Sequence, residues 1–244
     1  MFALFKMKCI LLTRDYIGLF FTIIFCPMLL VLFGTIYGNT PNPFFGGLGT
    51  VDISIPAYTG LVFAGAGLIS MPVSIASSRE RGELRRYQMT PVPPVAYLIT
   101  DMLVYYLVSL IGIALIVLIG YFGWGAVFEG NILFLIAGLL LSGICIFSIG
   151  LAVASVSGSA KAAQAIGMVV SFPMMFLSGA SMPLEMLPDA INKISKFMPL
   201  TYCVNSMRNI WVGNAFSTFQ NDFLIMFLVS VVFVIISFFI FKWD

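Results

Sequence analysis

The chain has 244 residues, of which 61% are hydrophobic and only 9% are charged, and its mean hydropathy is +1.08. The core of a soluble protein of this length could not bury so many apolar side chains. The composition therefore excludes a soluble globular fold and predicts a polytopic membrane protein.

The first residues of the chain favour a short helix that lies in the membrane interface. Apolar side chains recur there at helical spacing, whereas charged and polar side chains fall elsewhere. A frayed, positively charged tail is the alternative. The apolar residues of this predicted helix are Phe2, Phe5, Cys9 and Leu12.

Six stretches are apolar over roughly the 20 residues that a helix needs to cross a hydrocarbon layer about 30 Å thick. Only helices satisfy all of their backbone groups at that depth, so we expect an all-α integral membrane protein with one transmembrane domain over residues 1–244. The first stretch is too long for a signal peptide, and we expect it to be retained. The predicted spans are residues 17–37, 55–78, 102–122, 132–156, 162–182 and 223–241.

Basic residues indicate the orientation of these spans. With six spans, nine of the twelve Lys and Arg residues fall on the side that holds both termini. The positive-inside rule then places both termini in the cytoplasm. Lys193, Lys196 and Arg208 are the three on the other side. The four cysteines are expected to be free thiols, because no two share an oxidising compartment in a way that suggests a disulfide.

Several absences limit the chemistry of the chain. It has no His, no Gly-Lys pair and no Cys cluster, so it has no phosphate-binding loop of the usual kind, no metal site and little basis for enzymatic activity. The predicted spans, as bounded above, also contain no Asp, Glu, Lys or Arg, which disfavours ion-coupled transport. If the chain moves a substrate uphill, the energy is expected to come from another polypeptide.

Charges concentrate in one short segment between the second and third predicted spans. Its spacing fits a short helix in which Glu83 pairs with Arg79 and Arg86, while Leu84 and Tyr87 form a small apolar face. Such a helix can dock in a groove of a soluble partner. The alternative is a solvated loop that only sets topology or touches anionic lipid. The candidate contact residues are Arg79, Glu80, Arg81, Gly82, Glu83, Leu84, Arg85 and Tyr87.

Residues 183–214 form a second unusual segment, on the predicted outer side. Prolines and alternating apolar and charged residues favour a re-entrant or interfacial piece, with a surface helix that only anchors the chain as the alternative. Stripes of small or weakly polar residues also run along the second and fifth predicted spans, and close helix packing is the simplest explanation for both. The stripes include Ser70 and Ser74 in the second span and Met168, Ser171, Met175 and Ser178 in the fifth.

Two motifs carry a resemblance to a known family. The run RERGELRRYQMTPVPPVAYL resembles the E-R-x-G-x-L-x-x-x-x-x-[ST]-P segment of bacterial ATP-binding-cassette (ABC) export permeases of the second type, which export drugs, lipids and polysaccharides. Glu83 departs from the pattern, where Thr is more usual. The second motif is the run SGASMPLEMLPDAINKISKFMPLTYCVNSMRNIW before the last predicted span, which resembles the P-x-x-x-L-P…P-L-T-Y…R signature of the same family. The matching residues are Glu80, Arg81, Gly82, Leu84, Thr90 and Pro91 in the first run, and Pro183, Leu187, Pro188, Pro199, Leu200, Thr201, Tyr202 and Arg208 in the second.

The resemblance implies a function and a set of partners. The charged segment would be a cytoplasmic coupling helix on a separate ATPase, present in two copies, which binds ATP and Mg²⁺; this chain itself would need no cofactor. A second permease subunit, identical or paralogous, and membrane lipid would be the other partners, with no nucleic acid. Residues 183–214 would cap the exit, and the two stripes would line a central pathway.

The chain would then be a permease that exports hydrophobic or amphipathic cargo, such as a drug, lipid or peptide, across the bacterial cytoplasmic membrane. Two alternatives stay open from the sequence. One is a polysaccharide or glycolipid exporter, and the other is an immunity or pore protein that does not pump.

Overall fold

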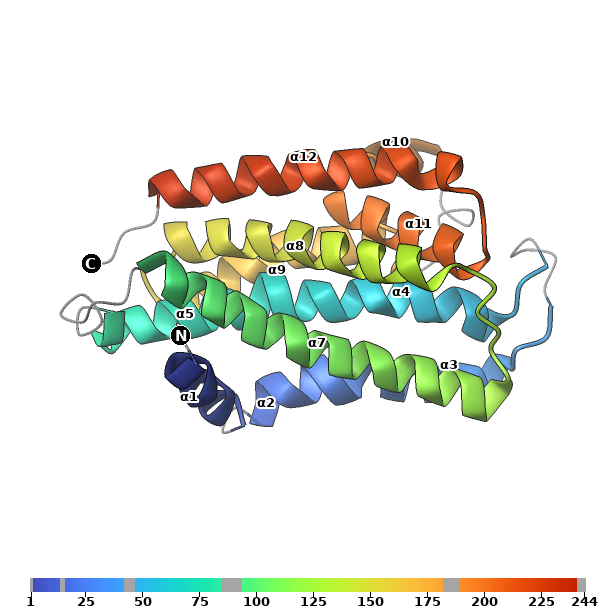
Figure 1. Ribbon diagram of the computed structural model, residues 1–244, viewed down its shortest axis with the longest axis horizontal. Helices are drawn as coiled ribbons and strands as arrows, with labels where there is room; N and C mark the ends of the chain where they lie inside the picture. The colour runs from blue at the N-terminus through green and yellow to red at the C-terminus, as the bar shows by residue number, and fades with distance from the viewer. Residues whose placement is uncertain (1, 14–15, 42–46, 85–93, 182–188, 241–244) are drawn as a thin grey trace.

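The computed structural model describes residues 2–13, 16–41, 47–84, 94–181 and 189–240, and every regular element in these ranges is a helix (Figure 1). In chain order they are α1 (Phe2–Leu12), α2 (Tyr16–Leu19), the π-helical η1 (Phe20–Ile24), α3 (Phe25–Tyr37), α4 (Thr50–Ala64), the π-helical η3 (Gly65–Ser70), α5 (Met71–Glu80), α7 (Pro94–Trp124), α8 (Ile132–Val156), α9 (Ala160–Leu177), α10 (Asp189–Ser195), α11 (Pro199–Trp211) and α12 (Phe216–Ile240).

Five helical stretches within the described residues are long and apolar enough to cross a membrane: Thr50–Glu80, Ala96–Trp124, Ile132–Val156, Ala160–Leu177 and Phe216–Ile240. They confirm the prediction of an all-α, multi-pass membrane protein. The predicted first span coincides with α2, η1 and α3, which follow one another without a gap over residues 16–37. Its described apolar part, Thr22–Tyr37, is shorter than the other five, so the count of six spans stays a prediction.

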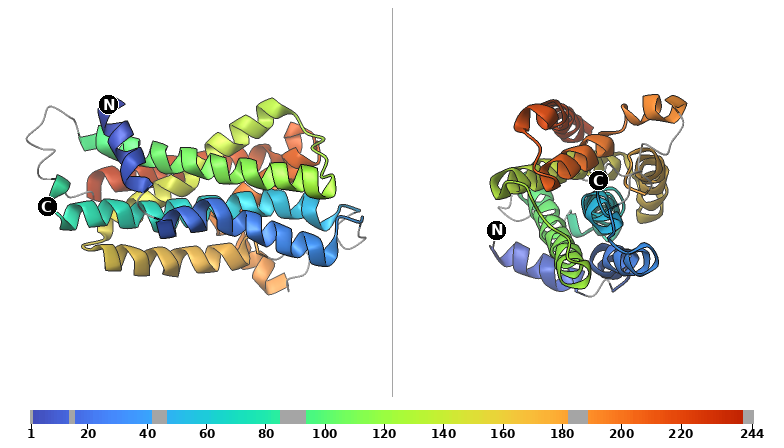
Figure 2. Two further views of the ribbon diagram at one scale, coloured as in Figure 1. Left: turned by 90° about the horizontal axis from the view of Figure 1, so that it is seen from below. Right: turned by 90° about the vertical axis from the view of Figure 1, so that its right-hand side faces the viewer.

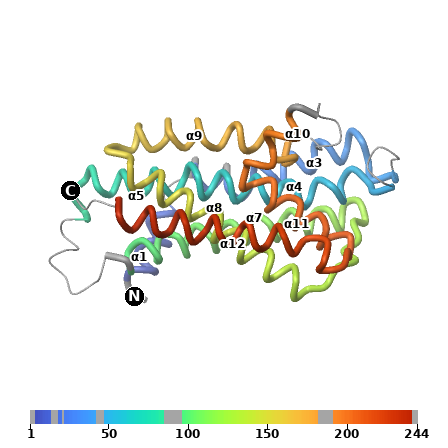
Figure 3. The backbone as a smooth tube through the Cα atoms, turned by 90° about the horizontal axis from the view of Figure 1, so that it is seen from above, coloured from blue at the N-terminus to red at the C-terminus, as the bar shows by residue number. Residues whose placement is uncertain are grey.

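The second span, made of α4, η3 and α5, lies at the centre of the bundle (Figure 2, right). It contacts α3, α7, α8, α9 and α11. Helix α9 runs along the upper edge of the bundle in Figure 3, and α12 runs along the upper edge in Figure 1, where most of its large side chains are exposed. The second span is therefore the element around which most of the described helices pack.

Small residues explain how closely the second span packs. A Cβ added at Gly150 of α8 would overlap the Gly67 carbonyl oxygen, and one added at Gly167 of α9 would overlap the Leu68 carbonyl oxygen. Small side chains let helix backbones approach to this degree. Within this chain the small residues therefore serve close packing between the second span and its neighbours.

The helices extend past the charged residues at which the predicted spans end. The third predicted span was bounded at residue 102, but α7 begins at Pro94 and includes the buried Asp101. The helical stretches that can cross a membrane also include Asp52, Arg79 and Asp222. Hydropathy ends a predicted span at its first charge, whereas α7 includes Asp101 because that carboxylate pairs with Lys8 of α1.

Candidate functional site at the charged end of the bundle

The charged segment starts as the end of the second span and not as a separate helix. Arg79 and Glu80 belong to α5, and the chain turns at Arg81 and Gly82. The φ of Gly82 is +67°, in the left-handed region that only glycine adopts without strain. Residues 79–84 are called the charged turn below, and the end of the bundle that holds this turn is called the charged end. Arg85 and Tyr87, with Thr90 and Pro91 of the family motif, lie outside the described residues.

Arg79 joins the charged turn to the end of α8. Its guanidinium donates hydrogen bonds to the carbonyl oxygens of Ala154, at 3.3 Å, and of Ser157, at 2.7 Å. The last carbonyls of a helix have no partner within the helix, and a cation placed there is stabilised by the helix dipole. Arg79 thus holds the ends of the second span and α8 together, whereas its contact with an ATPase stays a prediction.

Arg81 orders the turn and remains largely exposed. Its side chain bonds to Glu83 at 2.7 Å and donates to Ser77 Oγ at 2.6 Å. Burial raises the pKa of Glu83, but the hydrogen bond and the charge of Arg81 outweigh it and leave that pKa below its ordinary value. The Arg81 side chain is 56% exposed, so the pair contributes little to stability, about 0–1 kcal/mol. Arg81 and the exposed Glu80 are accessible to a partner.

Leu84 is not the exposed anchor that the sequence suggested. Its side chain is 0% exposed, and it packs with Leu4 of α1 and Tyr97 of α7. The apolar position of the charged segment is therefore covered by this chain's own N-terminal helix. Helical spacing identified an apolar residue that needs a partner, but spacing alone could not identify the partner.

A buried ion pair fixes α1 in this position. Lys8 Nζ lies 2.6 Å from Asp101 Oδ1 and donates to Tyr97 Oη at 2.5 Å, and the Lys8 and Asp101 side chains are 6% and 1% exposed. Burial lowers the pKa of Lys8, but the charge of Asp101 and the contact with Tyr97 outweigh it and raise the pKa above its ordinary value. The structure thus confirms a helix at the N-terminus, whereas the sequence gave no sign that Lys8 pairs with α7.

The opposite end of the bundle contains α10 and α11 (Figure 1), and two hydrogen bonds join α11 to the end of α10 and to the residue that follows it. Thr201 Oγ1 donates to the Ser195 carbonyl at 2.7 Å, and Tyr202 Oη donates to the Lys196 carbonyl at 2.6 Å. Pro199 begins α11, and Arg208 lies in its last turn. Helix α11 packs against α4, α8 and α12. The predicted exit cap thus includes a helix seated among the spans, while Pro183 and Pro188 lie outside the described residues.

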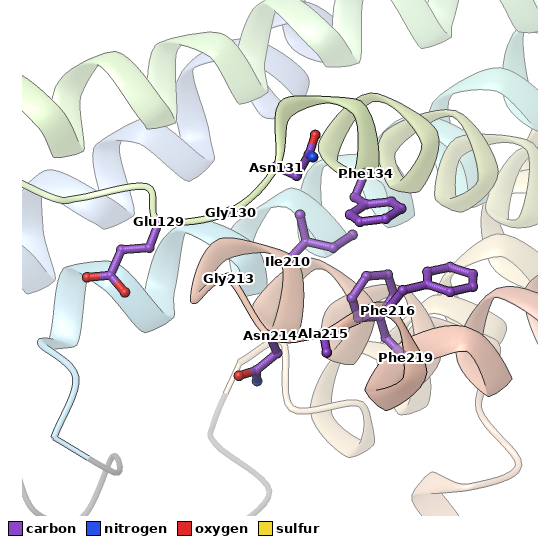
Figure 4. Close-up of a pocket in the computed structure, with 10 residues that line it drawn as sticks. All are labelled: Glu129, Gly130, Asn131, Phe134, Ile210, Gly213, Asn214, Ala215, Phe216 and Phe219. Atoms are coloured by element: carbon purple, nitrogen blue, oxygen red, sulfur yellow. The ribbon is translucent and has the colours of Figure 1, made fainter.

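A depression of about 440 Å³ also opens at this opposite end (Figure 4). It lies where the link between α7 and α8 meets the link between α11 and α12, with Phe134, Phe216 and Phe219 grouped on one side. The Glu129 side chain points away from these rings in Figure 4. The depression is separate from the charged turn and contributes nothing to it.

Comparison with known proteins identifies the family. A sequence profile described as ABC-2 family transporter protein matches residues 43–239, which is more than half of the chain. The chain belongs to this family. The match includes the charged turn and α10 and α11, so it supports the resemblance that both sequence motifs indicated.

Curated relatives of this ABC-2 chain include a named permease. The chain is 22% identical over 186 residues to "Probable multidrug ABC transporter permease YbhS" of Escherichia coli, covering 75% of this chain and 47% of that one. It is 27% identical over 176 residues to "ABC transporter G family member 20" of Dictyostelium discoideum, covering 72% and 23%. It is 29% identical over 96 residues to "Nodulation protein J" of Rhizobium leguminosarum, covering 39% and 35%. The chain therefore spans less than half the length of these relatives.

The residues of this ABC-2 chain that were predicted to line a pathway differ in how far their side chains are buried. Ser171 and Ser178 have buried side chains, and Ser171 Oγ donates to the Met168 carbonyl at 3.4 Å. Helix α9 contacts η3 and α5 on its buried side. This placement agrees with the packing alternative for these two serines. Ser70, Ser74, Met168 and Met175 are half-buried.

Proposed function

We propose that the chain is the membrane-spanning permease subunit of an ABC exporter and that a separate ATPase subunit supplies the energy. The observation that carries this proposal is the charged turn at the end of the second span, in a chain of the ABC-2 family. ATP and Mg²⁺ belong to the partner, and this chain has no nucleotide chemistry of its own. It works as a transport subunit and not as an enzyme.

The charged turn is suited to receive a movement from outside the membrane. Arg79 ties it to α8, and Leu84 ties it to α1 and α7. A displacement of the turn would strain charge-assisted hydrogen bonds and a buried apolar contact, so the attached helices would move with it. Glu80 and Arg81 are the described side chains that would meet the ATPase. Arg85 and Tyr87 remain predicted contacts.

The assembly is proposed to contain two ATPases and two permease subunits, with the second permease identical to this chain or a paralogue. The charged end lies in the cytoplasm of a bacterial cell, because Lys8, Arg79 and Arg81 gather there while Lys193 and Lys196 lie at α10. Both termini lie on the cytoplasmic side in this arrangement.

The cargo is proposed to be hydrophobic or amphipathic, such as a drug, a lipid or a peptide. The half-buried residues Ser70, Ser74, Met168 and Met175 are the candidates that could line its path, since flexible methionines adapt to varied apolar molecules. The exit gate would include Pro199, Thr201, Tyr202 and Arg208. The Escherichia coli relative is named a probable multidrug permease, and this name supports the proposed cargo class.

The coupling proposal is tested by reversing one charge. In tagged chain purified from its own membranes, Arg81→Glu should remove the cassette ATPase that copurifies with the wild type. Lys193→Glu makes the same charge change on α10 at the opposite end and is the control. Unchanged ATPase recovery with Arg81→Glu would refute the proposed contact.

The energy source needs a second experiment. Purified chain without its partner should hydrolyse no ATP, and export of a reporter cargo should stop when the catalytic residue of the ATPase is replaced. Export that survives this replacement and stops with a proton uncoupler would establish an ion-coupled carrier. An assembly that binds the ATPase but exports nothing would favour a protein that does not pump.

A further inference from the structure

An apolar cavity of about 340 Å³ lies inside the half of the bundle near the opposite end. It is bounded by α4, α7, α8 and α11, and the side chains that face it are almost all hydrocarbon. Ile113, Ala114 and Leu118 of α7, Leu139 of α8 and Trp211 of α11 are among them. An apolar cavity of about 150 Å³ stays dry and can hold benzene, so this larger cavity is suited to a longer hydrocarbon.

The cavity opens sideways, between two helices that are neighbours in the chain. The first half of α8 diverges from α7 (Figure 2, left). Ala114 and Leu118 line the cavity and are themselves exposed, so they mark its rim on α7. Large apolar side chains flank the opening, with Ile111 53% exposed and Ile136 50% exposed. In a membrane this surface meets lipid chains and not water.

Trp211 adds a polar group to this apolar wall. The residue is 5% exposed, and its indole Nε1 is buried with no hydrogen-bond acceptor among the described residues. The ring packs against Phe128, with the ring centroids 5.3 Å apart. Buried indole N–H groups usually find an acceptor. The wall of the cavity therefore includes a residue whose buried donor has no acceptor among the described residues.

We propose that an acyl chain of a membrane phospholipid occupies this cavity and that its ester carbonyl accepts a hydrogen bond from Trp211 Nε1. A phospholipid supplies both parts, the hydrocarbon and one acceptor at its end. A helix of a second copy does not fit, because a helix with its side chains is about 10–12 Å across. The proposal does not depend on which cargo the protein exports.

Fluorescence quenching tests the occupant directly. Trp124→Phe and Trp243→Phe together leave Trp211 as the single tryptophan of the chain. In nanodiscs of phosphatidylcholine brominated near the glycerol end of its chains, we expect strong quenching of Trp211, although the residue is buried within the protein. Adding Ala114→Phe should fill the mouth of the cavity and cause loss of this quenching.

The control adds the same bulk outside the cavity. Ala137 is an exposed alanine of α8 that does not line the cavity, so Ala137→Phe should leave quenching unchanged. Equal quenching in the Ala114→Phe and Ala137→Phe variants would overturn the proposal, as would absence of quenching in all of them. A photoreactive residue in place of Leu118 gives an independent result: cross-links to phospholipid support the proposal, and cross-links to another copy of the chain refute it.

Discussion

Removing Lys8 should destabilise the protein far more than its place near the N-terminus suggests. Lys8→Met would leave Asp101, which is 1% exposed, without its counter-ion. Loss of one partner from a buried ion pair costs about 3–5 kcal/mol because the remaining charge is uncompensated. Asp101→Leu should cost a similar amount for the same reason, since Lys8 is only 6% exposed.

The double variant Lys8→Met with Asp101→Leu should recover most of this loss. A buried ion pair replaced by apolar side chains of similar volume is often neutral or stabilising, because the cost of desolvating two charges is removed. The free energy of unfolding can be measured by titrating sodium dodecyl sulfate into mixed micelles of the purified variants. The losses of unfolding free energy in the two single variants should add up to several kcal/mol more than the loss in the double variant.

Additive effects would refute this reasoning. If each single variant lost less than about 1 kcal/mol, and the double variant lost the sum, the pair would behave as an exposed salt bridge. The position of α1 would then depend on the apolar contact among Leu4, Leu84 and Tyr97. Distances between spin labels on α1 and α7 distinguish the two cases. If the ion pair holds α1 in place, the distribution of these distances should broaden in the double variant.

The remaining predictions concern substitutions and a change of pH, and they use the same unfolding assay. Gly82→Ala should cost about 1–2 kcal/mol because the turn requires a left-handed backbone, and Gly82→Asn should cost less. Arg79→Met should cost about 1.5–3 kcal/mol through loss of its hydrogen bonds to the end of α8. Gly167→Ala should destabilise because its Cβ would overlap a backbone oxygen, whereas Gly123→Ala, with open space around it, should not. Since the pKa of Lys8 is raised above 10.5, its contribution should be complete below pH 10.5 and disappear as pH rises through the higher value.

Hydropathy was sufficient to predict the helices but not where they end. The predicted span at residues 132–156 coincides with α8, because no charge interrupts that stretch. Helix α7 begins at Pro94, eight residues before the predicted start of the third span. The missing part contains Asp101, and its burial depends on a lysine in a distant part of the chain. Pairings of this kind depend on tertiary structure, which local patterns do not contain.

Side-chain spacing likewise predicted which residues share a face but not what covers that face. Ser171 was placed on a stripe of α9, and the structure shows that Ser171 and Ser178 of this stripe pack within the chain. Leu84 was correctly recognised as apolar among charges, yet α1 covers it. A sequence pattern reports that a side chain needs a neighbour, and only the assembled fold determines which neighbour it receives.

The burial of Leu84 changes how the charged turn can bind an ATPase. With its apolar side chain already covered, the described part of the turn offers Glu80 and the guanidinium of Arg81, which are polar and exposed. A contact made mainly by such groups is sensitive to salt, since exposed charges are screened over about 10 Å at 0.1 M. Rigidity then has to come from inside the permease, where Arg79 and Leu84 are anchored to α8, α1 and α7. A weak, polar contact with the proposed ATPase would therefore move several spans at once, because the turn and these helices are joined behind it.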